Sequence, residues 1–283
     1  MPRTIVNDLS QFGRHAPSGL VARLLPLTRS TSATWTGKRR AFLLRAVGVT
    51  ALGGRPADVE SLGARMRLYP YNNVCEKRIL FTPQYFDPAE LAFLAQRITP
   101  DFVFVDLGSN VGGYSLFVAA RAGANARIVA VEPQPELYER LVYNIRQNPF
   151  ATIKALECAV ADQDGEITMF VDLQNRGETS MRMVQPAQKG GEIRVAARPL
   201  AALVADERLP RIDAMKLDIE GAEDLVLEPF FRDAPECVWP RTILLEYSPR
   251  RWSIDLPALL ARIGYAEVLR TDQNVAFERR TDA

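Results

Sequence analysis

The chain has 283 residues, of which 47% are apolar and 24% are charged, which is ordinary for one large globular domain or one domain with an appendage. The formal net charge is +1, so no overall electrostatic field favours nucleic acid as a partner. No stretch approaches 18 consecutive apolar residues, so we expect no transmembrane helix.

The charge and the cysteines add two expectations. Residues 1–60 carry nine Lys or Arg against three Asp or Glu, so this segment is near +6 and the rest is near −5. The cysteines are Cys75, Cys158 and Cys237, whose spacing indicates neither a disulfide framework nor a zinc site. The first residues lack the long apolar core of a secretory signal. We therefore expect a cytoplasmic protein.

In chain order, residues 1–62 are expected to form a basic, partly helical N-terminal extension, and residues 63–280 a single domain. KRRAFLLRAV (38–47) favours a short amphipathic helix in the extension. That helix could contact an anionic glycolipid or membrane surface, contact another subunit, or lie free in solvent. His15, the only histidine, is expected at the surface.

Beyond the extension, strand and helix patterns alternate. Residues 64–70 predict a strand, and a helix is expected to begin at Pro88 with Asp87 as its N-cap. Five further strands are predicted at 102–107, 127–133, 153–161, 214–220 and 242–249. Helices are predicted at 114–123 and 135–148 and after residues 220 and 255, and a hairpin near the C-terminus. Between the strands at 153–161 and 214–220 lies a β-rich insertion, in which NRGETSM (175–181) is typical of a substrate lid or a plain surface loop.

This alternation predicts an α/β fold with an open, doubly wound, mostly parallel sheet of seven strands. Such sheets bind ligands at the carboxyl ends of their strands. Nearly every predicted strand ends in an acid here, and the acids are Asp106, Glu132, Asp218, Glu220 and Glu246.

The strand predicted at 102–107 leads into DLGSNVGG (106–113), which contains neither GxGxxG nor GK[ST]. A pyrophosphate would be repelled by Asp106, whereas a ligand with an ammonium and a sulfonium would be attracted. Glu132, 26 residues later, has two oxygens that match a ribose diol. These residues favour S-adenosylmethionine. The alternatives are that Asp106 only caps the next helix and that Glu132 is a solvated strand end.

Five segments in order are similar to the FkbM-type methyltransferases: DLGSNVGGYSLFVA, VAVEPQPELYERLVYNI, AVADQDGEITM, DAMKLDIEGAE and LLEYSP. The resemblance covers about residues 64–270 and departs from the family pattern at Ser109 and the extra Gly113. It implies a class I, Rossmann-like methyltransferase fold that uses S-adenosylmethionine. It also implies a set of cofactor-binding residues. These are Asp106, Gly108, Asn110 and Gly112 at the methionine part, Glu132 at the ribose, Ala159, Val160 and Asp162 near the adenine, and in addition Ser109 and Pro133.

Methylation of a hydroxyl calls for a general base, and the predicted catalytic residues are Asp218, Glu220 and Glu246. Strand alternation would put Lys216, Asp218 and Glu220 on one side of the fourth strand. Structural ion pairs and helix capping are the alternative roles for these acids. No resident metal is predicted, although a carboxylate cluster could also hold a divalent cation.

The resemblance also implies O-methylation of a hydroxyl on a sugar, glycolipid or polyketide-type small molecule. We therefore expect an O-methyltransferase with a small-molecule, carbohydrate or glycolipid acceptor and no nucleic-acid partner. Two alternatives stay open, a module that binds the cofactor without turnover and a methyltransferase with an N-type or nucleic-acid acceptor. The D/N-P-P-Y/F motif of amino-methylating enzymes is absent from the sequence. The sequence does not indicate which acceptor is used or which oligomer forms.

Overall fold

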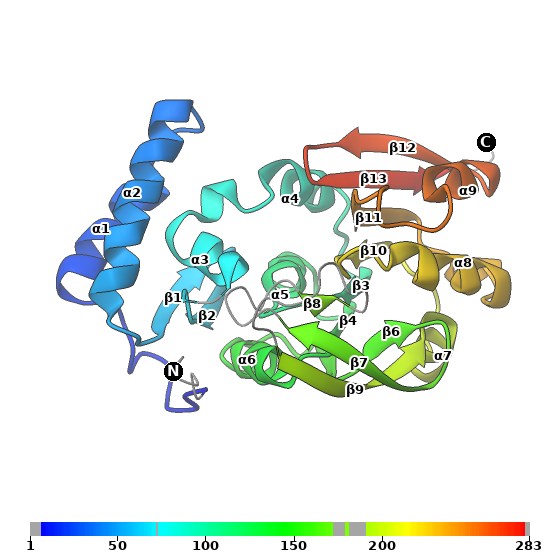
Figure 1. Cartoon of the computed structure of the whole chain (residues 1–283), viewed down its shortest axis with the longest axis horizontal. Coiled ribbons are helices and arrows are strands. Elements are labelled where there is room, and N and C mark those ends of the chain that lie inside the picture. The colour runs from blue at the N-terminus through cyan, green and yellow to red at the C-terminus, as the bar shows by residue number, and fades with distance from the viewer. Residues whose placement is uncertain (1–6, 72, 172–178, 181–190, 281–283) are drawn as a thin grey trace.

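Figure 1 shows the computed structural model, which describes residues 7–71, 73–171, 179–180 and 191–280. A seven-stranded sheet in the order β12-β13-β11-β10-β3-β4-β5 forms its centre. All neighbouring strands in it are parallel except β13, which is antiparallel to both β11 and β12. The predicted mostly parallel sheet and its terminal hairpin are therefore confirmed. The strands are β3 (Val103–Leu107), β4 (Arg127–Val131), β5 (Ile153–Leu156), β10 (Ala214–Leu217), β11 (Thr242–Glu246), β12 (Tyr265–Arg270) and β13 (Asn274–Arg279).

The central strands are apolar throughout because helices cover both faces of the sheet. Side chains alternate along β3, so Val105 joins one buried cluster and Phe104 joins the other. The first cluster includes residues of α7 (Leu200–Asp206), α8 (Glu223–Asp233) and α9 (Leu256–Arg262). The second includes residues of α3 (Val74–Phe81), α4 (Pro88–Ala95), α5 (Gly113–Ala119) and α6 (Pro135–Arg146). The sheet is thus doubly wound, as predicted.

The single strand predicted at 153–161 is wrong, because the chain divides there between two sheets. β5 pairs with β4, whereas β6 (Ala159–Ala161) pairs in parallel with β9 (Gly191–Pro199) in a separate four-stranded sheet. That sheet has the order β6-β9-β7-β8, with β7 at Gly165–Val171 and β8 at Thr179–Ser180. The β-rich insertion is therefore confirmed. Of the proposed lid, residues 175–178 and 181 lie outside the described residues.

The N-terminal region is more regular than the sequence indicated. It contains α1 (Gly19–Arg29), α2 (Trp35–Leu52) and an antiparallel hairpin of β1 (Ala57–Ser61) and β2 (Ala64–Leu68). The helix predicted at 38–47 is the middle of α2, which begins after Thr34, whose hydroxyl accepts a hydrogen bond from the amide of Gly37. The division predicted after residue 62 falls in the turn between β1 and β2.

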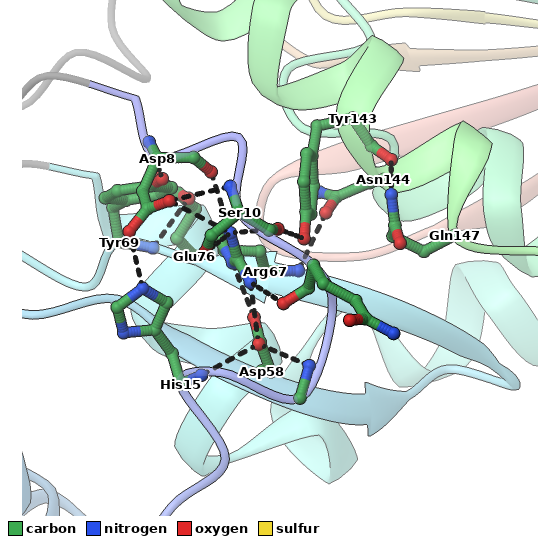
Figure 2. A network of polar contacts seen from close by, with 12 residues as sticks. Asp8, Ser10, His15, Asp58, Arg67, Tyr69, Glu76, Tyr143, Asn144 and Gln147 are labelled. Carbon is green, nitrogen blue, oxygen red and sulfur yellow. Dashed lines mark hydrogen bonds and ion pairs between the residues drawn. The ribbon is translucent and has the colours of Figure 1, made fainter.

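Figure 2 shows how residues 7–15 attach to this hairpin through Arg67 of β2, whose side chain is 1% exposed. The Arg67 guanidinium donates to both oxygens of Asp58 at 2.6 and 2.8 Å, and also to the main-chain oxygens of Asp8 and Ser10. His15 was expected at the surface, but its side chain is only 15% exposed and its Nε2 lies 2.6 Å from the Asp8 carboxylate. The start of the described chain is therefore attached to a buried ion pair.

Four local expectations need correction. The helix predicted at 114–123 ends at Ala119, and the strand predicted at 214–220 ends at Leu217. Asp87 does precede α4, but its side chain makes no capping bond and contacts Tyr114 instead. Helices α3 and α7 were not predicted. Within the described residues, no helix is both long and apolar enough to span a bilayer.

Candidate functional site

Two adjoining chambers open at the carboxyl ends of β3, β4 and β10. The narrow chamber, of about 60 Å³, lies beside β4 and β6, and the wide chamber, of about 310 Å³, lies beside β10, β11 and α3. Gly108, Asn110, Asp218 and Glu220 line both. The site therefore lies where a doubly wound sheet is expected to bind its ligand.

The turn after β3 separates the two chambers, and its backbone requires glycine. Gly108 has φ +77°, and a Cβ atom there would lie 2.0 Å from the main-chain oxygen of Asp218. Asn110 also has a positive φ, of +51°, and its side-chain oxygen accepts from Asn73 Nδ2 at 2.8 Å. The close approach of the turn to β10 therefore depends on residue 108 having no side chain.

Asp106 is 1% exposed and supports the first turn of α5. Its Oδ2 accepts from the amide of Ser115 at 3.1 Å and from the Ser115 hydroxyl at 2.6 Å. The helix-anchoring alternative is therefore realised, and Asp106 also lines the wide chamber. Burial raises the pKa of Asp106, although the charge of Lys216 on the neighbouring strand opposes the shift.

Glu132 is buried at the mouth of the narrow chamber and is not a solvated strand end. Its Oε2 accepts from the amide of Asn110 at 2.8 Å, and its Oε1 accepts from the amide of Gln134 at 2.9 Å. Burial raises its pKa to about 7, against the effect of these two hydrogen bonds. Each carboxylate oxygen keeps a second lone pair that can accept a ligand hydroxyl.

The remaining predicted cofactor residues fall into two groups. Pro133, Ala159 and Val160 line the narrow chamber, whose walls also include Leu137, Cys158, Met169 and Ile219. The Ser109 hydroxyl donates to the main-chain oxygens of Asp106 and Val131, so it holds the turn together. Gly112 and Asp162 are not among the residues that line either chamber, and Asp162 is exposed.

The wide chamber contains a buried lysine that the sequence had placed only as an ion-pair partner. Lys216 is 3% exposed, with its Nζ 2.8 Å from Asp218 Oδ2 and 4.7 Å from the centre of the Tyr114 ring. Burial lowers the pKa of Lys216, but Asp218 and Asp106 outweigh that effect and hold it above its ordinary value. Tyr114 in turn donates to Asp87 Oδ2 at 3.0 Å.

The other two predicted catalytic acids differ in their partners. β10 ends before Glu220, so strand alternation does not place this residue, which has φ +58° and lies 3.2 Å from Arg251. Glu246 ends β11, and burial followed by the charge of Asp218 raises its pKa to about 7. Its Oε2 is buried and has no hydrogen-bond partner among the residues that the structure describes. The three acids therefore lie in one chamber but have different partners.

The sequence did not single out the far wall of the wide chamber. Arg78 and Asp87 come from the α3–α4 region, Arg251 follows β11, and Asn274 begins β13. Of these four residues, only Asp87 has an unusual backbone conformation, with a φ of +40°. Across the described ranges, no group of three or more His, Cys, Asp or Glu is arranged to hold a metal ion.

A family model and a curated relative both identify this chain as similar to methyltransferases. A family model described as the methyltransferase FkbM domain matches residues 106–266, more than half of the chain. Methyltransferase sdnD of Sordaria araneosa is 28% identical over 215 residues, which cover 66% of this chain and 79% of that protein. The AMB antimetabolite synthetase AmbE of Pseudomonas aeruginosa is 26% identical over 214 residues, which cover 62% of this chain but only 10% of the synthetase.

Among solved structures, a precorrin-6y C5,15-methyltransferase of Geobacter metallireducens superposes with a TM-score of 0.40 at 14% identity. The superposition covers 70% of this chain and 90% of that one. This likeness is too loose to carry an argument about chemistry.

Proposed function

This chain belongs to the methyltransferase FkbM domain family, and from that premise we propose that it transfers a methyl group from S-adenosylmethionine to a hydroxyl of a sugar, glycolipid or polyketide-type small molecule. The observation that carries the proposal is the narrow chamber. Its charged lining residues are Glu132, Asp218 and Glu220. No described Lys or Arg lines it, and Lys216 and Arg251 contact Asp218 and Glu220 from the wide chamber. Such a lining suits a cationic ligand that also carries a ribose diol.

The lining residues offer partners for the groups of this cofactor, of which the narrow chamber, at about 60 Å³, takes only part and the adjoining wide chamber would take the rest. Glu132 would hold the ribose through its free lone pairs, and the apolar walls at Ala159 and Val160 would cover the adenine. Gly108 lets the turn approach the end of β10, and Asp218 would accept from the methionine ammonium. When bound, S-adenosylmethionine supplies a methyl group activated by its sulfonium.

Glu246 is the best candidate for the general base. A base must be able to accept a proton near neutral pH, and a pKa of about 7 meets that need. Asp218 is bound to Lys216 and Glu220 to Arg251, so both carboxylates are held by cations. The unpartnered Oε2 of Glu246 supports its role as the acceptor of the substrate proton.

The wide chamber supports a polar small-molecule acceptor. Its rim offers donors from Arg78, Arg251 and Asn274 and acceptors from Asp87 and Glu220, a mixture that suits several hydroxyls. The same acids would repel a nucleic-acid phosphate, which disfavours that alternative. The likeness to part of an antimetabolite synthetase also supports a natural-product acceptor.

Calorimetric titration with S-adenosylhomocysteine tests the cofactor site. We expect the wild type to bind, Glu132→Gln to lose about tenfold or more in affinity, and Glu228→Gln, an exposed acid on α8, to bind like the wild type. A folded wild type that does not bind would refute the cofactor assignment.

Transfer of a labelled methyl group onto pools of sugars and lipids then tests the reaction. Binding of S-adenosylhomocysteine without transfer to any such pool would favour a non-catalytic module or another class of acceptor. Label recovered on a hydroxyl group of a small molecule would support the proposed reaction.

A further inference from the structure

The pair of helices α1 and α2 lies at one end of the molecule (Figure 1). No residue of either helix lines the narrow or the wide chamber. Several large apolar side chains of α2 are exposed to solvent. Trp35 is 71% exposed, Leu43 64% and Val47 49%. Single exposed apolar residues are normal on a protein surface, but several on one helix call for an explanation.

These side chains form one face of α2. At about 100° per residue, Trp35, Phe42, Leu43, Ala46 and Val47 fall within an arc of roughly 140°. On this wheel, Lys38 and Arg40 lie at the two edges of the arc, and Arg39 lies within it. Thr36 and Thr50 also fall within the arc, so this apolar stripe is interrupted by three polar side chains and is flanked by cations.

Packing prevents α2 from turning this face inward. The opposite side of the helix buries Ala41, Gly48 and Leu52. Gly48 lies so close to Phe81 of α3 that a Cβ atom there would be 2.5 Å from the ring. The apolar stripe is thus held toward solvent by the contact that attaches the helix to the rest of the chain.

Charge indicates what this surface would bind. Between Asp8 and Asp58 the sequence contains no Asp or Glu, so every residue with a permanent charge in this stretch is Lys or Arg. The Arg39 guanidinium stacks on the Trp35 ring at 5.3 Å. No acidic partner of Lys38, Arg39 or Arg40 is found among the residues that the structure describes. The surface combines unneutralised positive charge with aromatic and aliphatic side chains.

We propose that this face of α2 binds the surface of an anionic lipid bilayer, with Trp35, Leu43 and Val47 at the level of the headgroups. Anionic headgroups attract the cations, and the interface accepts the apolar side chains. A second copy of the same face would bring like charges together, and a nucleic acid would leave the apolar stripe in water. The proposal does not depend on which reaction the enzyme catalyses.

Co-sedimentation of the full-length protein with lipid vesicles tests the proposal. The two vesicle types are pure phosphatidylcholine and phosphatidylcholine with about 30 mol% phosphatidylglycerol. We expect sedimentation with the anionic vesicles only, weakened by salt, together with a blue shift of tryptophan emission as Trp35 leaves water.

Two double variants separate the contributions to binding. The first, Leu43→Ser with Val47→Ser, removes apolar area, and the second, Arg39→Gln with Arg40→Gln, removes charge. We expect each double variant to bind the anionic vesicles about tenfold more weakly than the wild type. Val268→Ser and Arg232→Gln, at exposed positions on β12 and α8, are the matched controls and should partition like the wild type.

Four results would overturn the proposal. The wild type could stay in the supernatant with anionic vesicles at low salt, or the double variants could sediment as well as the wild type. Light scattering could instead show a dimer that the Leu43→Ser, Val47→Ser variant disrupts, which would assign the face to a second copy. A gel shift with RNA that depends on Arg39 and Arg40, without vesicle binding, would assign it to nucleic acid.

Discussion

Glu132 and Glu246 are two carboxyls of the candidate site that burial makes harder to ionise. Both are carboxyls whose pKa is raised to about 7, with burial as the first cause in each case. Their environments differ, because Glu132 accepts two backbone amides whereas Glu246 has a buried oxygen without a partner among the described residues. The first arrangement suits a fixed acceptor for a ligand and the second suits a group that gains and loses a proton.

If Glu246 is the base, the rate of methyl transfer should rise as the pH increases through about 7 and level off above it, because only the carboxylate accepts the proton. Glu246→Gln should lower kcat by about 100-fold or more and remove this pH dependence, while affinity for S-adenosylhomocysteine is kept. Initial rates across pH measure this. Glu228→Gln should leave the profile unchanged, and a full pH dependence in Glu246→Gln would assign the base elsewhere.

The raised pKa of Glu132 also makes a stability prediction. Between its ordinary value of 4.5 and about 7, the folded state binds more protons than the unfolded state, so this group's contribution to stability falls as pH rises. As the pH rises from about 4.5 to 8 without ligand, the unfolding free energy of Glu132→Gln should therefore increase relative to that of the wild type by roughly 1–3 kcal/mol. Urea unfolding at the two pH values measures it. A constant difference between the two proteins would contradict the shift.

At the scale of elements, the turn from β3 to α5 is the part that most directly shapes the site. Gly108 combines a positive φ with a close backbone contact to the end of β10, so it sets the distance between two neighbouring strand ends. Asn73, the N-cap of α3, holds Asn110 in the same turn and so connects the helix that lines the wide chamber to the narrow one. The two chambers are therefore built as a unit.

Gly108→Ala should cost about 2–4 kcal/mol in unfolding free energy and weaken S-adenosylhomocysteine binding by about tenfold or more, because both the strand end and the turn must move. Gly53→Ala is the matched control, since Gly53 also has a positive φ, of +60°, but has open space around it. It should cost only about 1 kcal/mol and leave binding intact. Equal effects of the two substitutions would show that the close contact is unimportant.

At the scale of the whole molecule, the N-terminal extension is part of the fold. Arg67 connects residues 8–11 and Asp58 across the β1–β2 hairpin, and Arg140 of α6 forms a second buried pair with Glu76 of α3 (Figure 2 labels Arg67, Asp58 and Glu76). Asn7 accepts from Arg140 at 2.9 Å, so both buried pairs contact the start of the described chain.

Asp58→Ala should destabilise the protein by about 3–5 kcal/mol, because it leaves the buried Arg67 without its nearest carboxylate. Asp8, 3.6 Å from Arg67, would moderate the loss. Thermal unfolding measures the change. Asp233→Ala, which breaks an exposed pair with Arg232, should leave the midpoint where it is, and a similarly small effect of Asp58→Ala would mean that the extension is only loosely attached.

The sequence by itself was sufficient for the sheet, and it also predicted that a candidate site would lie at the carboxyl ends of the strands. Apolar strands that end in Asp106, Glu132 and Glu246 are local patterns, and parallel strands place their carboxyl ends at one edge whatever the loops do. The turn at Gly108 could also be predicted, because backbone positions with a positive φ favour glycine.

Only the tertiary structure decided how those residues are used. Whether residues 153–161 form one strand or two depends on β4 and β9, which are distant in sequence. The pairing of Asp218 with Lys216 and of Glu220 with Arg251 depends on how the strand ends and loops are brought together, as does the unpartnered oxygen of Glu246. Local patterns determine which elements form, whereas burial and long-range partners, which no local pattern encodes, set the charge state and role of each acid.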